Sequence, residues 1–141
     1  MIVASQYDTA NLLAEWQWLV PITDTPLFIS CFGDWVFGHP DGSLWVLSAL
    51  EGDYFQVAKD ASEYNTLNKS TEWLEDTFLA GWQVIAAGHG LQPEKDQCLG
   101  WKLHPLLGGK FEVANLQLFT MNVYQSLMGQ LHRQIQGRNS P

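Results

Sequence analysis

The sequence predicts an α+β fold, in a single domain spanning residues 1–141, with a central antiparallel sheet and helices packed on one face. Three observations predict it. Three short β-prone segments at about 34–38, 43–48 and 54–58 are separated by turn sequences. Amphipathic helical patterns follow them. Two later strand-like segments and a C-terminal helical pattern then complete the chain, and we expect the later strands to join the same sheet.

The meander occupies GDWVFGHPDGSLWVLSALEGDYFQVA, residues 33–58. HPDG at 39–42 and LEGD at 50–53 each place a glycine where a tight turn needs a positive φ. Alternation along the strands puts apolar residues on one side of each, as expected for a half-exposed sheet: Trp35 with Phe37, Leu44 with Val46, and Phe55 with Val57.

Helices are expected on either side of the meander. Residues 9–19 have apolar residues near helical spacing, with Thr9 as the candidate N-cap. After the meander, Asp60 and Glu63 form a capping-box pattern, and another amphipathic helix is expected to start near Ser70.

The C-terminal part of the chain predicts two strands and a helix. The segments 98–105 and 113–121 alternate in the manner of strands. Asn122 is the expected N-cap of the last helix, and Gly137 is expected to lie beyond its end. An apolar stripe recurs every four residues and is expected to dock on the sheet: Val123, Leu127, Leu131 and Ile135.

The charge of the chain excludes several classes of partner. The formal net charge is −8, from 7 basic and 15 acidic residues, so phosphate backbones and anionic membrane surfaces are repelled. A basic protein or a cation is attracted instead. The N-terminus lacks the basic leader of a signal peptide, and a cytoplasmic location is expected. Cys31 and Cys98 are expected to be free thiols, although the sequence leaves a bridge between them open.

Searches for catalytic, metal and cofactor motifs give no match. A P-loop at Gly109-Lys110 fails because His104 stands where its first glycine should be, and none of the four histidines has metal-ligand spacing. We therefore expect no catalytic residue, no metal and no cofactor. The acidic turns of the meander, with an aromatic anchor, are the candidate partner-binding surface: Asp34, Asp41, Trp45, Glu51, Asp53 and Tyr54. The alternative interpretation of these carboxylates is a solvated rim.

Two segments carry a family resemblance. Residues 32–64 combine a Gly-Asp-aromatic strand with a Trp-x-Leu strand and a Glu-Gly turn. Residues 98–135 contain a Gly-aromatic-Lys strand, Leu-Gly-Gly, Asn-Leu and a terminal helix. Over about residues 28–136 the chain resembles the C-terminal domain of immunity proteins that neutralise type VI secretion DNase effectors. That family was long catalogued as a domain of unknown function and is often associated with GAD-like domains.

The resemblance implies a bacterial, non-enzymatic binding protein that blocks the nuclease site of a basic effector toxin by occupying it. It implies a protein partner, and neither nucleic acid nor membrane. An alternative function is a small-ligand or regulatory module with Trp35, Trp45 or Trp101 on a pocket wall, and a second is an enzyme of unrecognised type. The sequence leaves open whether a toxin partner exists, the oligomeric state and the strand order.

Overall fold

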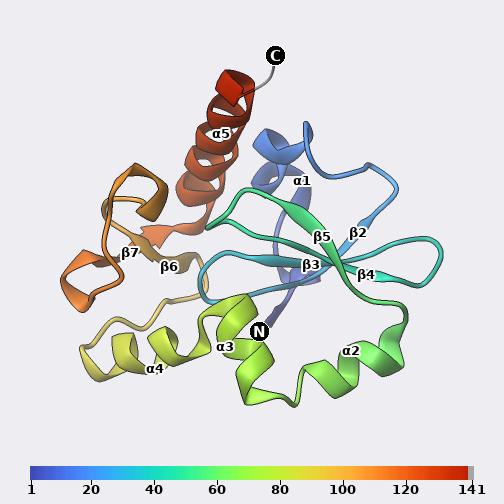
Figure 1. Ribbon diagram of the computed structural model, residues 1–141, viewed down its shortest axis with the longest axis horizontal. Coiled ribbons are helices and arrows are strands. Elements are labelled where there is room, and N and C mark those ends of the chain that lie inside the picture. Colours follow the sequence, from blue (N-terminus) through green and yellow to red (C-terminus); the bar gives the residue numbers. More distant parts are fainter. Residues whose placement is uncertain (140–141) are drawn as a thin grey trace.

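The computed structural model describes residues 1–139, which form a mixed α+β fold, as the sequence predicts. Its main sheet is antiparallel, with strand order β1-β2-β3-β4-β5 (Figure 1). The strands are β1 (Ile2–Val3), β2 (Thr25–Ile29), β3 (Trp35–Gly38), β4 (Leu44–Leu47) and β5 (Tyr54–Ala58). The last three strands are the predicted meander.

The turns of the meander also form as predicted. At the β3–β4 turn the Gly42 amide donates to the His39 carbonyl at 2.9 Å, and Gly42 has φ +91°. At the β4–β5 turn the Gly52 amide donates to the Ser48 carbonyl at 2.8 Å, and Gly52 has φ +71°. Both glycines therefore hold the left-handed conformation that residues with a Cβ avoid.

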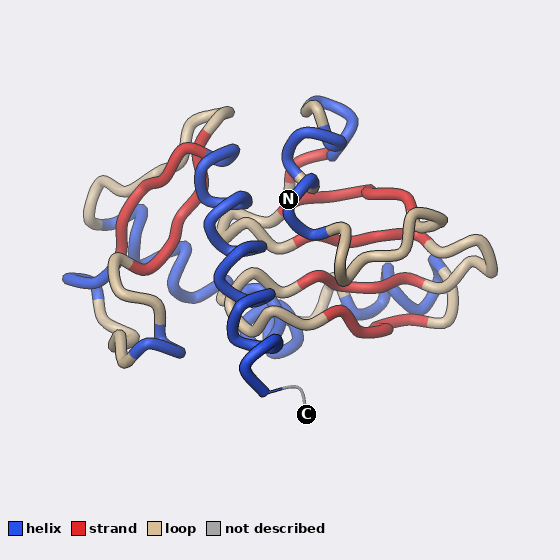
Figure 2. Tube along the Cα trace, turned by 90° about the horizontal axis from the view of Figure 1, so that it is seen from above, coloured by secondary structure: helices blue, strands red, loops and turns tan. Residues whose placement is uncertain are grey.

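The two later strands do not join this sheet, which corrects the expectation of one sheet. β6 (Gln97–Trp101) and β7 (Leu116–Thr120) pair only with each other. The C-terminal helix α5 (Met121–Asn139) runs between the two sheets (Figure 2). An alternating pattern identifies a strand but not its neighbour, and here the small sheet is joined to the main one through a loop bond, Leu99 N–H to the Cys31 carbonyl at 2.8 Å.

Helices cover both faces of the main sheet, not one face. On the first face, Trp35 and Phe37 pack with Leu12, Trp16 and Tyr124 from the two ends of the chain. On the second face, the buried cluster is formed by Val36, Leu44, Val46, Ala58, Tyr64 and Phe78. β3 and β4 are thus largely buried on both sides, whereas β5 exposes Gln56 and Phe55, the latter with 37% of its surface exposed.

The segments before and after the meander differ in how regular their helices are. At the N-terminus, α1 (Thr9–Leu12) is capped by Asp8 rather than Thr9 and gives way to a 3₁₀ turn at Ala14–Trp16. After the meander, α2 (Ala61–Leu67) and α3 (Thr71–Phe78) have the predicted caps, since the side chain of Asp60 accepts from Glu63 N–H and that of Ser70 from Trp73 N–H. α4 (Ala80–Gly88) follows at once, because Leu79 turns the chain with φ +57°.

The face that α5 buries is not the predicted one. Val123 and Leu127 are 51% and 49% exposed, whereas Gln125 and His132 are almost fully buried. The buried polar groups are satisfied, because Gln125 accepts from Trp16 Nε1–H at 2.9 Å and donates to the Gly33 carbonyl at 2.7 Å. The spacing of apolar residues could not predict this face, because the face is centred on the buried amide side chain of Gln125. Gly137 lies inside this helix, so it does not mark its end.

Candidate functional site: an acidic cleft at one end of the main sheet

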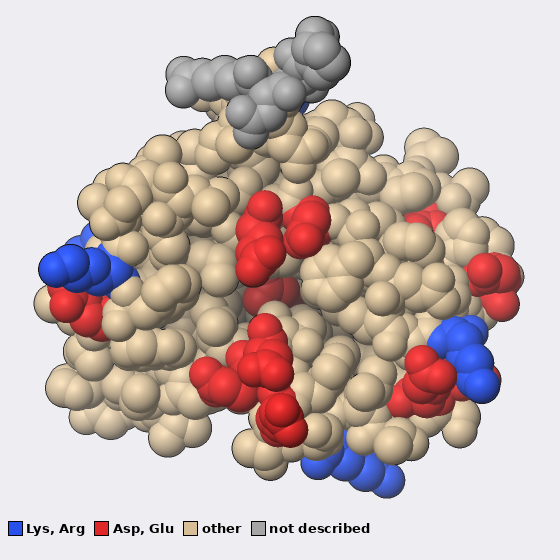
Figure 3. Space-filling model, in the orientation of Figure 1, with Lys and Arg blue, Asp and Glu red and all other residues tan. Residues whose placement is uncertain are grey.

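A cleft of about 270 Å³ lies where the β2–β3 loop and the β4–β5 turn meet the end of α3. Four of its lining residues are acidic, namely Asp34, Glu51, Asp53 and Asp76. The others are uncharged: Ser48, Leu50, Phe55, Thr77 and Leu79. Figure 3 shows acidic side chains gathered around a hollow at the centre of this face. We call this site the acidic cleft.

Side chains of α5 contact the turn that carries Glu51 and Asp53 and fix its position. The Nε2–H of His132 donates to the Ala49 carbonyl at 2.8 Å, and its ring lies so close to Gly52 that a Cβ there would overlap it. Gln136 also donates to the Gly52 carbonyl at 3.0 Å. The acidic turn is therefore fixed before any partner arrives, which lowers the entropy cost of binding.

Asp34 is the innermost carboxylate of the cleft. It is only 4% exposed, and its Oδ1 accepts from Ala49 N–H at 2.8 Å while its Oδ2 accepts from the Ser30 hydroxyl at 3.2 Å. Burial raises the pKa of Asp34 to about 7 from its usual 3.8. The two hydrogen bonds oppose that rise, and the negative charge of Asp53 adds to it.

The carboxylates of Glu51, Asp53 and Asp76 are exposed and make no hydrogen bond or ion pair with another residue in the described part of the chain. Among the side chains that the structure describes, no lysine or arginine lines the cleft to neutralise them. Within residues 1–139, no group of three or more His, Cys, Asp or Glu side chains is arranged to hold a metal ion. The arrangement favours contact with a cationic group that brings its own donors.

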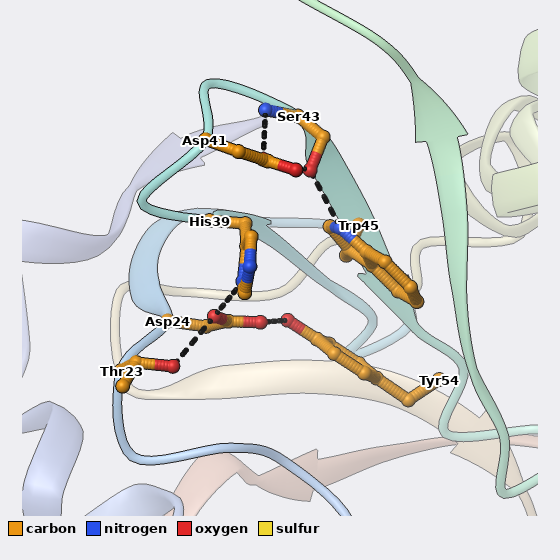
Figure 4. A network of polar contacts seen from close by, with 7 residues as sticks. All are labelled: Thr23, Asp24, His39, Asp41, Ser43, Trp45 and Tyr54. Carbon is orange, nitrogen blue, oxygen red and sulfur yellow. Dashed lines mark hydrogen bonds and ion pairs between the residues drawn. The ribbon is translucent and has the colours of Figure 1, made fainter.

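A second acidic group lies at the opposite end of the main sheet and has a different character (Figure 4). The buried Asp24 carboxylate accepts from His39 Nδ1–H and from the Tyr54 hydroxyl, each at 2.5 Å. The ring of Tyr54 stacks on Trp45, with ring centroids 5.3 Å apart. Burial, followed by the hydrogen bond and charge of Asp24, raises the pKa of Tyr54.

Asp41 closes the same end of the sheet. Its Oδ1 accepts from both the backbone N–H and the hydroxyl of Ser43, at 2.8 and 2.5 Å, and these bonds lower the pKa of Asp41. The Ser43 hydroxyl in turn accepts from Trp45 Nε1–H at 2.9 Å. These carboxylates are engaged in holding their own loops.

The six candidate residues therefore divide into two groups. The acidic cleft brings together Asp34, Glu51 and Asp53. The opposite network holds Asp41, Trp45 and Tyr54 (Figure 4). Sequence reasoning omitted Asp76 from this set, because only the tertiary packing of α3 beside the β4–β5 turn brings it to the cleft.

Comparison with known protein families gives one match. A sequence profile described as T6SS immunity protein Tdi1, C-terminal, matches residues 58–132, just over half of the chain. The chain belongs to this family. The match confirms the resemblance to type VI secretion immunity domains seen in the sequence, and no curated protein matches the chain. The matched segment of this Tdi1 C-terminal family member begins at the end of β5 and includes Asp76, whereas the other three cleft carboxylates precede it.

A cavity elsewhere in this immunity-family chain is a different site. It measures about 920 Å³ and lies between the second face of the sheet, α2 and the α3–α4 region. None of its lining side chains is charged, and none belongs to a tryptophan. The predicted pocket wall of Trp35, Trp45 or Trp101 is thus not found at this cavity.

Two histidines and two cysteines of this family member lie in or beside its core. His104 and His132 pack edge to face at 5.3 Å, and burial lowers the pKa of both. Cys31 and Cys98 are free thiols whose pKa values burial raises. No helix among the described residues is long and apolar enough to cross a membrane.

Proposed function

We propose that this chain is a non-enzymatic, cytoplasmic immunity protein that neutralises a basic, nuclease-like effector toxin by covering its active site. The acidic cleft is the proposed contact surface. The family supplies the immunity role, and the cleft supplies the chemistry, because its three exposed carboxylates have no partner among the described side chains. A nuclease that grips phosphates presents cationic groups, and an acidic surface of this kind attracts the same groups.

The shape of the cleft supports a preformed contact. Asp34 fixes Ala49 at the start of the β4–β5 turn, and α5 fixes the rest of that turn. Phe55 stands exposed at the cleft edge, beside Glu51 and Asp53, where it offers an apolar contact to a docked partner. Carboxylates of this type speed association and select the partner, and apolar neighbours slow dissociation.

The test is a pull-down with the purified chain against lysate of its source, followed by a nuclease assay on the basic protein that it retains. A retained nuclease that loses activity as the chain is titrated to equal concentration supports the proposal. A retained nuclease that stays fully active with the chain bound contradicts active-site occlusion.

Charge reversal locates the contact. The double variant E51K/D53K should weaken binding of that toxin at least ten-fold, through slower association and most strongly at low salt. The matched control is D41K at the opposite end of the sheet, which changes a single acidic side chain already bonded to Ser43. Equal losses in both variants, or none in either, would remove the acidic cleft as the contact surface.

A second candidate function is a module that binds a small uncharged ligand, and the 920 Å³ cavity favours it. That volume lies within the range of ligand pockets, and an uncharged lining suits a neutral amphipathic molecule. Thermal denaturation in the presence of a panel of neutral amphipathic metabolites tests it. A panel without any shift in melting temperature counts against this function.

A further inference from the structure

We propose that residues 103–111, between β6 and β7, form a rigid apolar anchor that makes a second contact with the toxin held by the acidic cleft. We call this segment the apolar loop. The inference rests on the proposed function. It adds a second contact surface, which is apolar where the cleft is acidic.

The apolar loop exposes four large hydrophobic side chains within nine residues. Leu103, Leu106, Leu107 and Phe111 are 49%, 54%, 56% and 49% exposed. Clustered exposed apolar groups of this kind mark interaction surfaces more often than isolated ones do. The chain thus presents an apolar cluster on one short segment, next to the end of a strand.

The apolar loop is held in one shape by a side chain outside it. Asn115 accepts from Leu103 N–H at 2.9 Å through its Oδ1, and its Nδ2 donates to the carbonyls of Leu103 and Lys110 at 2.9 and 3.0 Å. Three bonds from one amide close the segment into a ring. The distinctive Leu-Gly-Gly and Asn-Leu elements of the sequence therefore belong to one hydrogen-bonded structural unit.

The glycines make that closure possible. Gly108 adopts φ +97°, which favours glycine, and a Cβ on Gly109 would overlap the Leu103 carbonyl oxygen. His104 adds a cap, since its Nδ1 accepts from Leu106 N–H at 3.1 Å. A rigid loop binds without the ordering cost of a mobile one, so its apolar side chains suit an anchor.

The apolar loop is continuous with the acidic cleft through one buried cluster. The ring of Phe111 meets Trp101 at 5.0 Å, and Trp101 meets Trp82 at 5.5 Å. The same cluster includes Leu50 and Leu79, which line the cleft. In Figure 1 the β6–β7 sheet lies beside the end of the main sheet where the cleft opens. In this proposal one partner spans both sites.

The charges around the apolar loop differ from those of the cleft. Lys102 directly precedes it and Lys110 lies within it, and both are exposed; they are two of the seven lysine and arginine residues in the chain. Glu112 follows directly. The occupant that complements this pattern has cationic groups opposite the cleft and an apolar hollow bordered by carboxylates opposite the loop. A uniformly basic partner would fit the cleft alone.

The test uses the full chain and the toxin identified in the pull-down, with binding kinetics measured by surface plasmon resonance. The variant L106D/L107D should raise the dissociation rate constant at least ten-fold and change the association rate constant less than three-fold. E51K/D53K should mainly slow association. The matched control is V84D on α4, where Val84 is 73% exposed outside both sites. It should bind as the wild type does.

The outcomes separate the two proposals. Unchanged kinetics in L106D/L107D, with weakened binding in E51K/D53K, overturn the apolar anchor and leave the proposed function standing. A wild-type chain that binds no toxin overturns both. A dimer of the free chain that sedimentation detects and L106D/L107D abolishes assigns the loop to self-association, and this also overturns the anchor.

A positioning role for Asn115 provides a further check. N115A should raise the dissociation rate constant of the toxin complex, because the loop loses the three bonds that fix it. Hydrogen exchange at residues 103–110 should become faster in the same variant. Faster exchange with unchanged dissociation would show that rigidity of the loop contributes nothing to binding.

Discussion

The two ends of the main sheet are both acidic, yet they use their carboxylates in opposite ways. At one end, Asp24 and Asp41 each accept two or more hydrogen bonds from neighbouring loops. At the other end, Glu51, Asp53 and Asp76 accept none from the described residues and face the cleft. The number of acidic residues therefore does not distinguish the two ends of the sheet, whereas the hydrogen-bonding state of these exposed and engaged carboxylates does.

The largest difference in stability between the two ends of the sheet is expected at the glycines of their turns. Gly52→Ala should destabilise the chain by roughly 4 kcal/mol, because it adds backbone strain and drives a Cβ into the His132 ring. Gly42→Ala should cost only about 1 kcal/mol, since its Cβ would meet nothing within 4 Å. Urea denaturation of both variants measures the difference. Equal losses would show that α5 does not brace the cleft turn.

The next largest effect concerns pH. The folded-state pKa of Asp34 is raised to about 7, so its stabilising contribution is complete below pH 4 and is lost as the pH rises through 7. D34N should therefore match the wild type near pH 4 and exceed its stability at pH 8 by roughly 4 kcal/mol. His104 and His132 have lowered pKa values and act with the opposite sign. For that reason the difference between D34N and wild type, followed by denaturation across pH 4 to 8, isolates Asp34.

A smaller loss of stability is expected from the opposite end. D24A should cost about 2 kcal/mol, because it leaves the partly buried Tyr54 hydroxyl and His39 Nδ1–H without their acceptor. D53A in the cleft should cause no measurable loss. Thermal unfolding of the two variants compares them directly. A larger loss in D53A than in D24A would reverse the distinction drawn between the two ends.

The smallest effect probes the electrostatic coupling inside the cleft. D53N should lower the pKa of Asp34 without returning it to 3.8, because the charge of Asp53 contributes less to the rise than burial does. Carboxyl NMR titration of Asp34 in both proteins measures it. An unchanged pKa of Asp34 would mean that the charge of Asp53 does not act on the Asp34 carboxyl group.

Local features of the fold could be predicted from the sequence, but its long-range arrangement could not. The meander and the capping residues Asp60 and Ser70 were predicted correctly, because turn and cap chemistry acts within four residues. The pairing of β6 with β7 alone, and the docking of α5 through Gln125 and His132, depend on contacts between residues far apart in the sequence.

The candidate site was predicted in the same partial way. Asp34, Glu51 and Asp53 were selected because they lie at or near turns, and the structure places all three in one cleft. Asp41 was selected on the same ground but lies at the other end, since a hairpin sends its successive turns to opposite ends of the sheet. Trp45 and Tyr54 were selected as aromatic anchors, and their side chains join the network of Asp41 and Asp24. Whether the cleft binds a partner stays a prediction.

The position of α5 has a consequence for anyone who would express the family segment by itself. Residues 58–132 end within α5 but leave out almost all of the main sheet, along with Trp16 and Gly33, to which Gln125 is bonded. Such a fragment would expose Gln125, Tyr124 and the face of α2 that packs on β4, with nothing to cover them. We expect it to be insoluble, and we therefore expect the unit that folds to be longer than the segment that the family profile matches.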